Sequence, residues 1–228
     1  MIPLRDTARS RGTPYVNYAL IVLCGAVFLY ELSLGERLEG FLFRYGLIPA
    51  QLSSTVHHGS FSLAPLGSIF TSMFLHAGWL HLMGNMLFLY VFGDNVEARL
   101  GHRGYLGFYL ACGVTAAVIQ VAFSPHSQVP MVGASGAIAG VLGAYFILFP
   151  KARILTLIPL FVFFPVVEIS AFFFLGFWFL LQFAQAYLSG GLSAAEAGVA
   201  WWAHAGGFAS GAALLPVFLL LHRGKRSA

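Results

Sequence analysis

The sequence predicts an all-α membrane protein, a bundle of six transmembrane helices with both termini on the cytoplasmic side. Apolar residues make up 59% of the 228 positions and charged residues only 9%, whereas a soluble domain carries about 25% charged residues. A soluble domain is excluded, because 23 phenylalanines would leave large apolar patches on its surface. Lysine and arginine also gather in alternate connecting segments, which is typical of multi-pass membrane proteins.

Apolar stretches long enough to cross a bilayer, about 20 residues each, recur along the chain. We expect transmembrane helices at residues 15–34, 79–98, 105–123, 134–149, 165–188 and 201–221. A long, partly amphipathic outer loop, residues 35–78, separates the first two spans. The whole chain, residues 1–228, is expected to form a single membrane domain.

The apolar stretch before the fifth span is unusually long. From Ile154 to Leu188 it would measure about 52 Å as a helix, too long for one span and too short for two with a turn. Pro159 and Pro165 interrupt its first third. We therefore interpret Ile154–Phe164 as an interfacial or broken approach and begin the fifth span at Pro165. Glu168 then lies inside the membrane near its inner side, where we expect a structural role.

The basic residues orient the bundle. With six spans and an inner N-terminus, the outer loops hold only Arg37 and Arg44. A seventh span would put the basic C-terminus outside, against the positive-inside rule. The basic tails suit an anionic inner leaflet, so the net charge of +4 requires no nucleic acid partner. The inner segments hold the other ten basic residues: Arg5, Arg9, Arg11, Arg99, Arg103, Lys151, Arg153, Arg223, Lys225 and Arg226.

With this topology, polar side chains from three distant spans fall at one depth near the outer side. His81 begins the second span with Asn85 one turn deeper, Ser135 begins the fourth, and His204 lies just inside the sixth. A lone polar residue in a span more often serves packing or hydrogen bonding. As a set they predict chemistry, because an imidazole can accept the proton of a serine hydroxyl and make it a nucleophile. Ser135 and His204 are the catalytic candidates.

Small residues at helical spacing line the two spans that carry this pair. Such residues let helix backbones approach closely. Ordinary membrane-helix packing explains them as well, and that packing would bring the serine to the histidine. The candidates for packing support are Gly136, Gly140, Gly207 and Gly211.

An oxyanion hole is expected beside Ser135. The free N–H groups at the start of the fourth span are natural donors, and His81 and Asn85 could add side-chain donors. Gly133 completes the candidate set. No Asp or Glu lies near His204 in the sequence, which favours a dyad over a triad.

The sequence predicts neither a metal site nor a cofactor. It contains no cluster with metal-ligand spacing. Cys24 and Cys112 both fall in apolar segments, so we interpret them as small apolar residues and not as a disulfide.

Three motifs together strongly resemble those of the rhomboid family of intramembrane serine proteases. They are Gly133-Ala134-Ser135-Gly136, His81-Leu82-Met83-Gly84-Asn85 and Ala203-His204-Ala205-Gly206-Gly207, and the resemblance extends over nearly the whole chain. It implies Ser135 as nucleophile, His204 as general base, and His81, Asn85 and the Ser135 N–H as oxyanion stabilisers. It further implies a watery cavity open to the outer side, a first loop partly in the outer leaflet and a mobile cap at Ser189–Gly198.

The expected function is hydrolysis of a peptide bond in or next to the transmembrane segment of a membrane protein substrate. Cleavage is expected near small or helix-breaking residues, because an intact helix hides its peptide bonds. Two alternatives stay open, namely a non-catalytic rhomboid-like factor that binds or traffics membrane proteins and a small transporter or channel. The sequence names neither the substrate nor the oligomeric state.

The expected location is the bacterial inner membrane, as a multi-pass integral protein. Arg5, Arg9 and Arg11 keep a mitochondrial location open as a weaker alternative.

Other polar and aromatic residues carry less specific expectations. His76 is interpreted as an interfacial hydrogen-bonding residue or as part of a cavity entrance. Asp94, Glu97 and Arg99 are expected to be structural. Trp178 and the run Phe172–Phe174 are expected to face lipid or pack on the second span, and they are candidates for a lateral gate.

Overall fold

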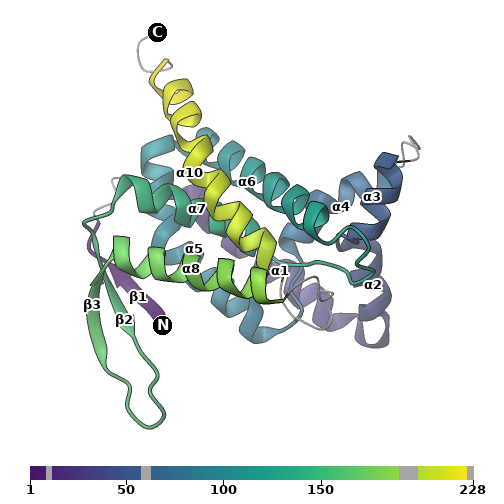
Figure 1. Cartoon of the computed structure of the whole chain (residues 1–228), viewed down its shortest axis with the longest axis horizontal. Helices are drawn as coiled ribbons and strands as arrows, with labels where there is room; N and C mark the ends of the chain where they lie inside the picture. Colours follow the sequence, from purple (N-terminus) through teal and green to yellow (C-terminus); the bar gives the residue numbers. More distant parts are fainter. Residues whose placement is uncertain (9–11, 58–62, 190–199, 225–228) are drawn as a thin grey trace.

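A computed structural model describes residues 1–8, 12–57, 63–189 and 200–224, and this part of the chain is mostly helical. The longer helices form one bundle (Figure 1), in which α7 packs against α5, α6, α8 and α10. Five of them match predicted spans within a few residues at each end. The sixth, α8, starts later than the predicted fifth span. These helices are α1 (Tyr15–Ser33), α5 (Trp79–Leu100), α6 (His102–Phe123), α7 (Ser135–Leu148), α8 (Ala171–Leu188) and α10 (Trp201–Gly224).

Four helices in the described part of the chain are long and apolar enough to cross a membrane, namely α1, α6, α8 and the Trp201–His222 part of α10. The segment Leu63–Phe74 and α5 meet the same criterion as a pair bent by 78°. α7 is apolar but has only 14 residues, about 21 Å of helix against a hydrocarbon core of about 30 Å. The chain is a multi-pass integral membrane protein.

Protein surrounds α7 on all sides. Every residue from Ala137 to Tyr145 is buried, as expected for a helix that is apolar around its whole circumference. The neighbouring helices therefore fix the position of Ser135, the first residue of α7.

The predicted outer loop is folded into short helices. They are η1 (Gly35–Arg37), α2 (Leu38–Tyr45), α3 (Pro49–His57), α4 (Leu63–Thr71) and η2 (Ser72–Phe74). They lie at the end of the bundle opposite the N-terminal strand (Figure 1). Leu47 and Met131 exchange backbone hydrogen bonds of 3.0 and 2.7 Å, which ties this loop to the segment that leads into α7.

Glu97 joins three helices at the other end. Its carboxylate accepts the N–H groups of Val16 and Asn17 at 3.0 and 2.7 Å, two donors that have no partner within the first turn of α1. The ring Nδ1 of His102, the first residue of α6, lies 2.5 Å from the same carboxylate. Glu97 has the structural role expected from the sequence.

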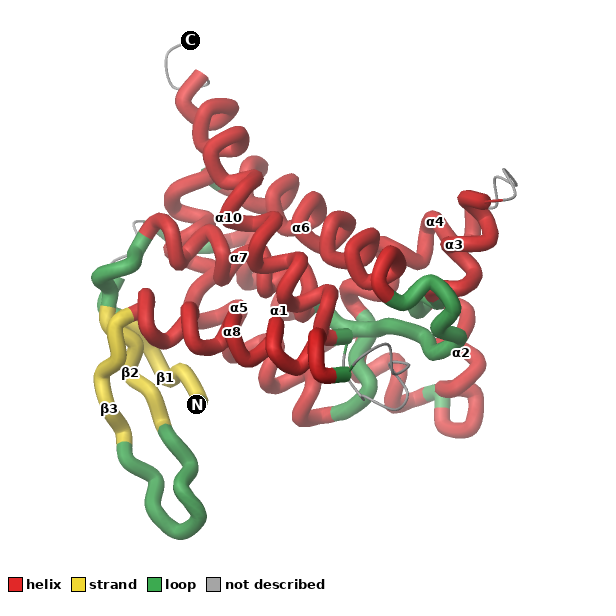
Figure 2. Tube along the Cα trace, in the orientation of Figure 1, coloured by secondary structure: helices red, strands yellow, loops and turns green. Residues whose placement is uncertain are grey.

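A small antiparallel sheet accompanies the helices (Figure 2). It consists of β1 (Ile2–Asp6), β2 (Arg153–Leu157) and β3 (Val166–Ser170), in the order β1-β2-β3. Strands β2 and β3 form a hairpin, closed by two 2.8 Å backbone hydrogen bonds between Leu160 and Phe163. The prediction of an all-α fold is therefore correct for the bundle but misses this sheet.

The predicted start of the fifth span at Pro165 is wrong, and Ile154–Phe164, expected to be an interfacial or broken approach, is not helical. These residues form β2 and the hairpin end, and α8 starts only at Ala171. Proline disfavours a helix here, and β1 supplies the strand that β2 needs on its other edge. That partner is about 150 positions away, with Ile2 opposite Leu157, so local sequence patterns could not reveal it.

Glu168 consequently lies outside any span. It is an exposed residue of β3, with its Oε2 4.0 Å from the Arg153 Nε on the neighbouring strand. The prediction that Glu168 lies within the fifth span is wrong, because the helix of that span starts only at Ala171.

Candidate active site

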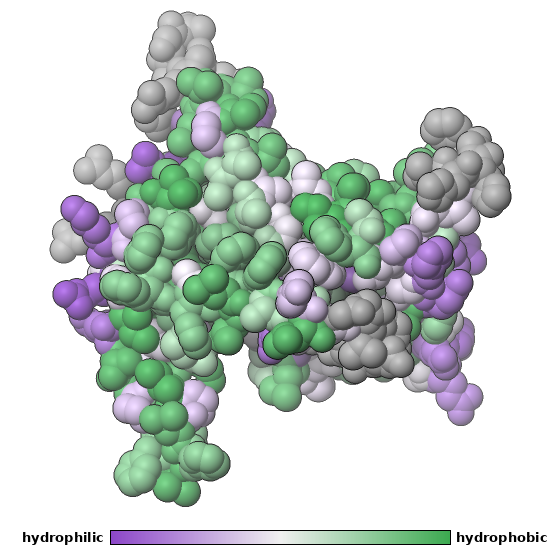
Figure 3. Space-filling model, in the orientation of Figure 1, coloured by the Kyte–Doolittle hydropathy of each residue, from purple (hydrophilic) through white to green (hydrophobic). Residues whose placement is uncertain are grey.

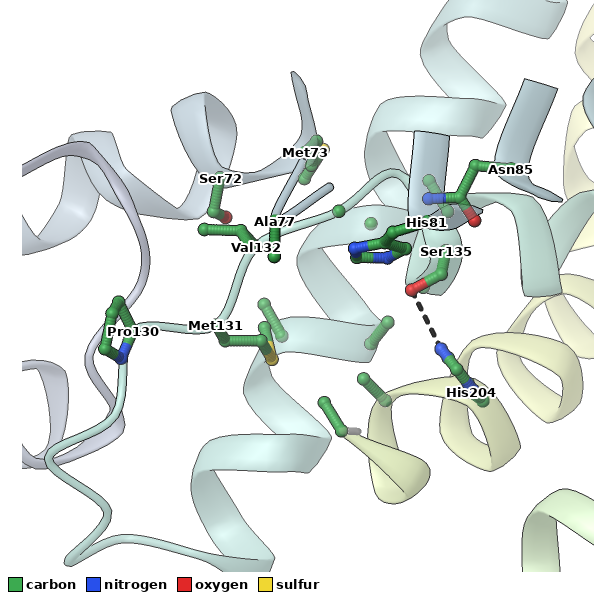
Figure 4. Close-up of a pocket in the computed structure, with 18 of the residues that line it drawn as sticks. Ser72, Met73, Ala77, His81, Asn85, Pro130, Met131, Val132, Ser135 and His204 are labelled. Atoms are coloured by element: carbon green, nitrogen blue, oxygen red, sulfur yellow. Dashed lines mark hydrogen bonds between the residues drawn. The ribbon is translucent and has the colours of Figure 1, made fainter. Parts of the chain in front are cut away.

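Ser135 and His204 meet where α7 and α10 begin. The Ser135 Oγ lies 2.8 Å from the His204 Nε2 (Figure 4). Although 69 positions separate the two residues, both lie in the first turn of their helices. The structure therefore brings the predicted nucleophile and base within hydrogen-bonding distance.

Glycines let the two helices approach this closely. A Cβ added at Gly211 would lie 2.1 Å from the Gly140 carbonyl oxygen, and one at Gly207 would lie 2.3 Å from that of Gly136. Gly136 and Gly140 themselves face α6, since their added Cβ atoms would meet Ala116 and Cys112. All four predicted packing glycines thus lie at helix contacts, with α7 held between α6 and α10.

A third side chain, Gln182 of α8, contacts the histidine from behind. Its Oε1 lies 2.6 Å from the His204 Nδ1. An amide oxygen only accepts, so Nδ1 carries the ring proton, and Nε2 is left to accept the Ser135 hydroxyl. The sequence did not point to Gln182, because no acid lies near His204 along the chain and an amide was not expected in the place of one. A usable signal was present, since buried polar side chains inside spans are commonly functional.

Two tryptophans flank the histidine ring. The ring centroids of Trp178 and Trp201 lie 6.1 and 6.0 Å from that of His204. The ring centroid of Trp178 also lies 6.4 Å from that of Phe88 on α5. Trp178 therefore packs on the second span, which is one of the two positions predicted for it. A gating role for Trp178 stays a prediction.

A cavity of about 900 Å³ adjoins the serine. Its walls come from the start of α5, the segment before α7 and the start of α10, and include Trp79, Met131, Val132 and Trp201. His81 and Asn85 point into it toward Ser135 (Figure 4). The cavity offers space for a substrate segment beside the hydroxyl.

Donors for an oxyanion are available on this wall. The Asn85 Nδ2 is buried and has no hydrogen-bond partner among the described residues, which is unusual for a buried amide. Ser135 is the first residue of α7, so its N–H has no partner within the helix. Both groups are therefore free to donate to a developing negative charge.

Gly133 was predicted to belong to the oxyanion hole, but the structure gives it a different place in the site. Its N–H already donates to the Ser72 carbonyl at 2.9 Å, so it is not a free oxyanion donor. Its φ is +124°, in a region that favours glycine, and a Cβ there would lie 2.7 Å from the His81 ring. Gly133 leaves room for the imidazole of His81.

His76 is a buried hydrogen-bonding residue. It is 2% exposed, and its backbone N–H faces the Glu31 carboxylate at 3.3 Å. Its ring centroid lies 5.3 Å from that of His81, so it supports the wall of the cavity from behind.

Two further predictions concern the cap and bound groups. The cap predicted at Ser189–Gly198 falls almost entirely on residues 190–199, which lie outside the described residues. Within the described ranges, no group of three or more His, Cys, Asp or Glu side chains could hold a metal ion. Cys24 and Cys112 are both buried and free.

Comparison with known proteins identifies the family. The model of the Rhomboid domain matches residues 65–221. The rhomboid protease GluP of Bacillus subtilis is 35% identical over 134 residues, which cover 58% of this chain and 24% of that protein. Rhomboid-like protein 11, chloroplastic, of Arabidopsis thaliana is 44% identical over 71 residues, 31% of this chain and 25% of that protein.

Relatives occur in more than one compartment. Rhomboid protein 1, mitochondrial, of Saccharomyces cerevisiae is 35% identical over 92 residues, 39% of this chain and 27% of that protein. The chain therefore spans about a quarter of the length of these three relatives. Because the family model matches most of its length, the chain belongs to the rhomboid family.

Proposed function

We propose that this chain is an intramembrane serine endopeptidase, which hydrolyses a peptide bond in or next to the transmembrane segment of membrane protein substrates. The observation that carries the proposal is the 2.8 Å contact between the Ser135 Oγ and the His204 Nε2. Membership of a family with protease-named relatives supports it.

The chemistry follows from the tautomer that Gln182 selects. As the Ser135 Oγ attacks the peptide carbonyl carbon, its proton moves to the His204 Nε2. The resulting imidazolium donates both ring N–H groups, and Gln182 accepts the one at Nδ1. When the C–N bond breaks, His204 returns the proton to the leaving amine, and water then hydrolyses the acyl-enzyme by the same steps.

The oxyanion is stabilised by donors that exist before the substrate binds. We assign this role to the Ser135 N–H and the Asn85 amide, with His81 beside them. Preorganised donors of this kind contribute about 2.7 to 4 kcal/mol each to the transition state.

We further propose six membrane spans, both termini on the cytoplasmic side and a single domain over residues 1–228, in the bacterial inner membrane. The sheet, the α5–α6 turn and the end of α10 lie together, since Gly101 lies against the His222 ring and the Asn95 amide donates a hydrogen bond to the Asp6 carboxylate. The basic residues Arg99 and Arg153 are at this end, which supports its assignment to the inner side.

The proposed substrate is a transmembrane segment that unwinds locally. A helical substrate hides its peptide bonds in its own backbone hydrogen bonds, so one of these bonds must be exposed before it can meet Ser135 in the cavity of about 900 Å³. Segments with small or helix-breaking residues are therefore expected to be cleaved first.

The test is cleavage of a model transmembrane substrate in liposomes. Ser135→Ala and His204→Ala should each reduce cleavage by at least about a thousandfold, as expected when a unit of nucleophile and base is broken. Ser54→Ala and His126→Ala are the matched controls, because both residues are exposed and distant from the site, and both should retain activity. Retained cleavage in either site variant would refute the assigned roles.

A fluorophosphonate probe separates catalysis from binding. The unaltered protein should react at Ser135 and the Ser135→Ala variant should not. A correctly folded protein that fails to react would instead favour a non-catalytic binder of membrane proteins.

A further inference from the structure

The β2–β3 hairpin ends in a cluster of exposed apolar side chains. We call residues Leu160–Phe164 the hairpin tip. Phe161, Val162 and Phe163 are 101%, 80% and 72% exposed, and the sequence has no charged residue between Arg153 and Glu168. The tip extends well beyond the helices (Figure 1) and is apolar to its end (Figure 3). Water is a poor solvent for such a patch, and exposed clusters of this kind mark interaction sites.

The apolar surface of the tip continues onto a helix that crosses the membrane. β3 ends at Ser170 and α8 begins at Ala171 without a connecting loop. The first exposed residues of α8, Phe172 and Phe173, are also aromatic. In Figure 1 the hairpin runs at a steep angle to α8. When α8 crosses the bilayer, the hairpin therefore extends along the surface of the bilayer. The hairpin therefore lies at the boundary between the lipid that surrounds α8 and the water beyond it.

Positive charge gathers at the base of the hairpin. Arg99, Lys151 and Arg153 are all exposed there, and the Arg99 guanidinium lies 5.9 Å from the centre of the Phe149 ring, just before the hairpin. Glu168 forms a weak pair with Arg153, with its Oε2 4.0 Å from the Nε. An apolar end with a cationic base is the division of side chains found in elements that bind anionic membrane surfaces.

We propose that the β2–β3 hairpin is a membrane anchor. Its tip inserts among the acyl chains of the leaflet at the sheet end of the bundle, and Lys151 and Arg153 contact anionic lipid headgroups. The partner is the lipid surface itself. The rival partner is a second copy of the chain, paired through the outer edge of β3, which in the described part of the chain bonds to β2 alone.

A nitroxide label measures the depth of the tip in liposomes. The label is attached to Phe161→Cys, and its collisions with oxygen and with a water-soluble nickel chelate are compared by electron paramagnetic resonance. Cys24 and Cys112 are fully buried, so the unaltered protein gives the labelling background. Phe173→Cys on α8 is the control for lipid, and Arg103→Cys, an exposed basic position, is the control for water.

The expected depth is about 5 to 10 Å into the headgroup and acyl boundary, the range of interfacial elements. The label at Phe161→Cys should then resemble Phe173→Cys, with oxygen collisions dominant. Nickel collisions as frequent as at Arg103→Cys would overturn the proposal. Spectral broadening that disappears when unlabelled protein is added would also overturn it, because it would reveal the second copy.

A charge variant tests the base of the hairpin separately. In the unaltered sequence, a label at the tip should lie deeper in phosphatidylglycerol liposomes than in phosphatidylcholine liposomes. Lys151→Gln with Arg153→Gln should remove this difference, while the melting temperature in micelles shows that the fold is kept. If the difference persists in a folded variant, the headgroup contact is refuted. Neither readout requires proteolysis, so the outcome is independent of the Ser135 test.

Discussion

In the proposed site, Gln182 takes the place that an acid holds in a Ser-His-Asp triad. Its oxygen lies 2.6 Å from the His204 Nδ1 and fixes the ring tautomer. An amide achieves this without a full charge in the membrane, where an unpaired carboxylate is expensive. The proposed site is therefore a hydrogen-bonded line of three side chains on three helices.

Replacing Gln182 by leucine should reduce kcat by about 10- to 100-fold, because the histidine loses its partner and the unreactive tautomer becomes populated. KM and the melting temperature should change little. Gln182→Glu keeps an acceptor oxygen and should retain more activity than Gln182→Leu. Steady-state kinetics on a model transmembrane substrate check this, and equal activity of the leucine variant and the unaltered enzyme would show that Gln182 does not position the ring.

Asp6 is a second residue whose environment has a measurable effect. Its carboxylate accepts the Tyr145 hydroxyl and the Asn95 Nδ2, the latter at 3.0 Å, which fastens β1 to α7 and α5. Burial, with a smaller contribution from Asp94, raises the pKa of Asp6 from 3.8 to about 6. Folding therefore favours the protonated form of this carboxyl.

The stability contributed by protonated Asp6 is fully present below its unfolded pKa of 3.8 and is lost as the pH rises through about 6. The melting temperature in micelles should thus rise as the pH falls from 7 to 5. Asp6→Asn keeps an acceptor for Tyr145 but does not titrate, so its rise should be smaller. An identical pH dependence in both proteins would assign the effect to other groups.

At the scale of elements, the contact between α7 and α10 is the one on which the site depends. Gly211 tolerates no side chain, since a Cβ would lie 2.1 Å from the backbone of Gly140. Gly25 on α1 offers a matched control, because a Cβ there would meet nothing within 4 Å.

Gly211→Ala should destabilise the fold by about 1 to 3 kcal/mol, as overpacking does, and should lower activity by moving His204 away from Ser135. Gly25→Ala should change neither property by more than the roughly 1 kcal/mol of helix propensity. Thermal unfolding and cleavage of the model substrate are the measurements. If the two variants unfold at the same temperature and cleave the substrate equally well, the close contact between α7 and α10 is not required for stability or activity.

The elements also show where sequence patterns suffice. Length and apolarity located α1, α5, α6, α7 and α10 closely, because lipid requires every backbone polar group to be bonded within a span. The same signal failed over Ile154–Pro165, which is apolar but bonded between strands. The Gln182 contact was missed for a related reason, since spacing along one helix does not reveal a partner on another.

At the scale of the whole molecule, the charge count makes a prediction about sidedness. Arg103, at the start of α6, should face the cytoplasm, and Gln51, on α3, should face the opposite side. Both side chains are exposed. Arg103→Cys and Gln51→Cys therefore report on the two ends of the bundle.

A membrane-impermeant maleimide added to intact cells should label Gln51→Cys and leave Arg103→Cys unlabelled until the membrane is opened. The buried Cys24 and Cys112 should contribute little background. Labelling of Arg103→Cys in intact cells would reverse the topology, and equal labelling of both would contradict a fixed orientation.

The short length of α7 affects how water, the second reactant of hydrolysis, reaches the site. Hydrolysis consumes one water molecule per peptide bond, and α7 falls about 9 Å short of the hydrocarbon thickness by the rise per residue. Because protein encloses this helix, the bilayer need not thin to match it, and the cavity of about 900 Å³ beside Ser135 is space that water can fill. A helix extended by two turns would close that space. The number of residues in α7 would then set how readily water reaches the proposed acyl-enzyme, without any change in Ser135 or His204.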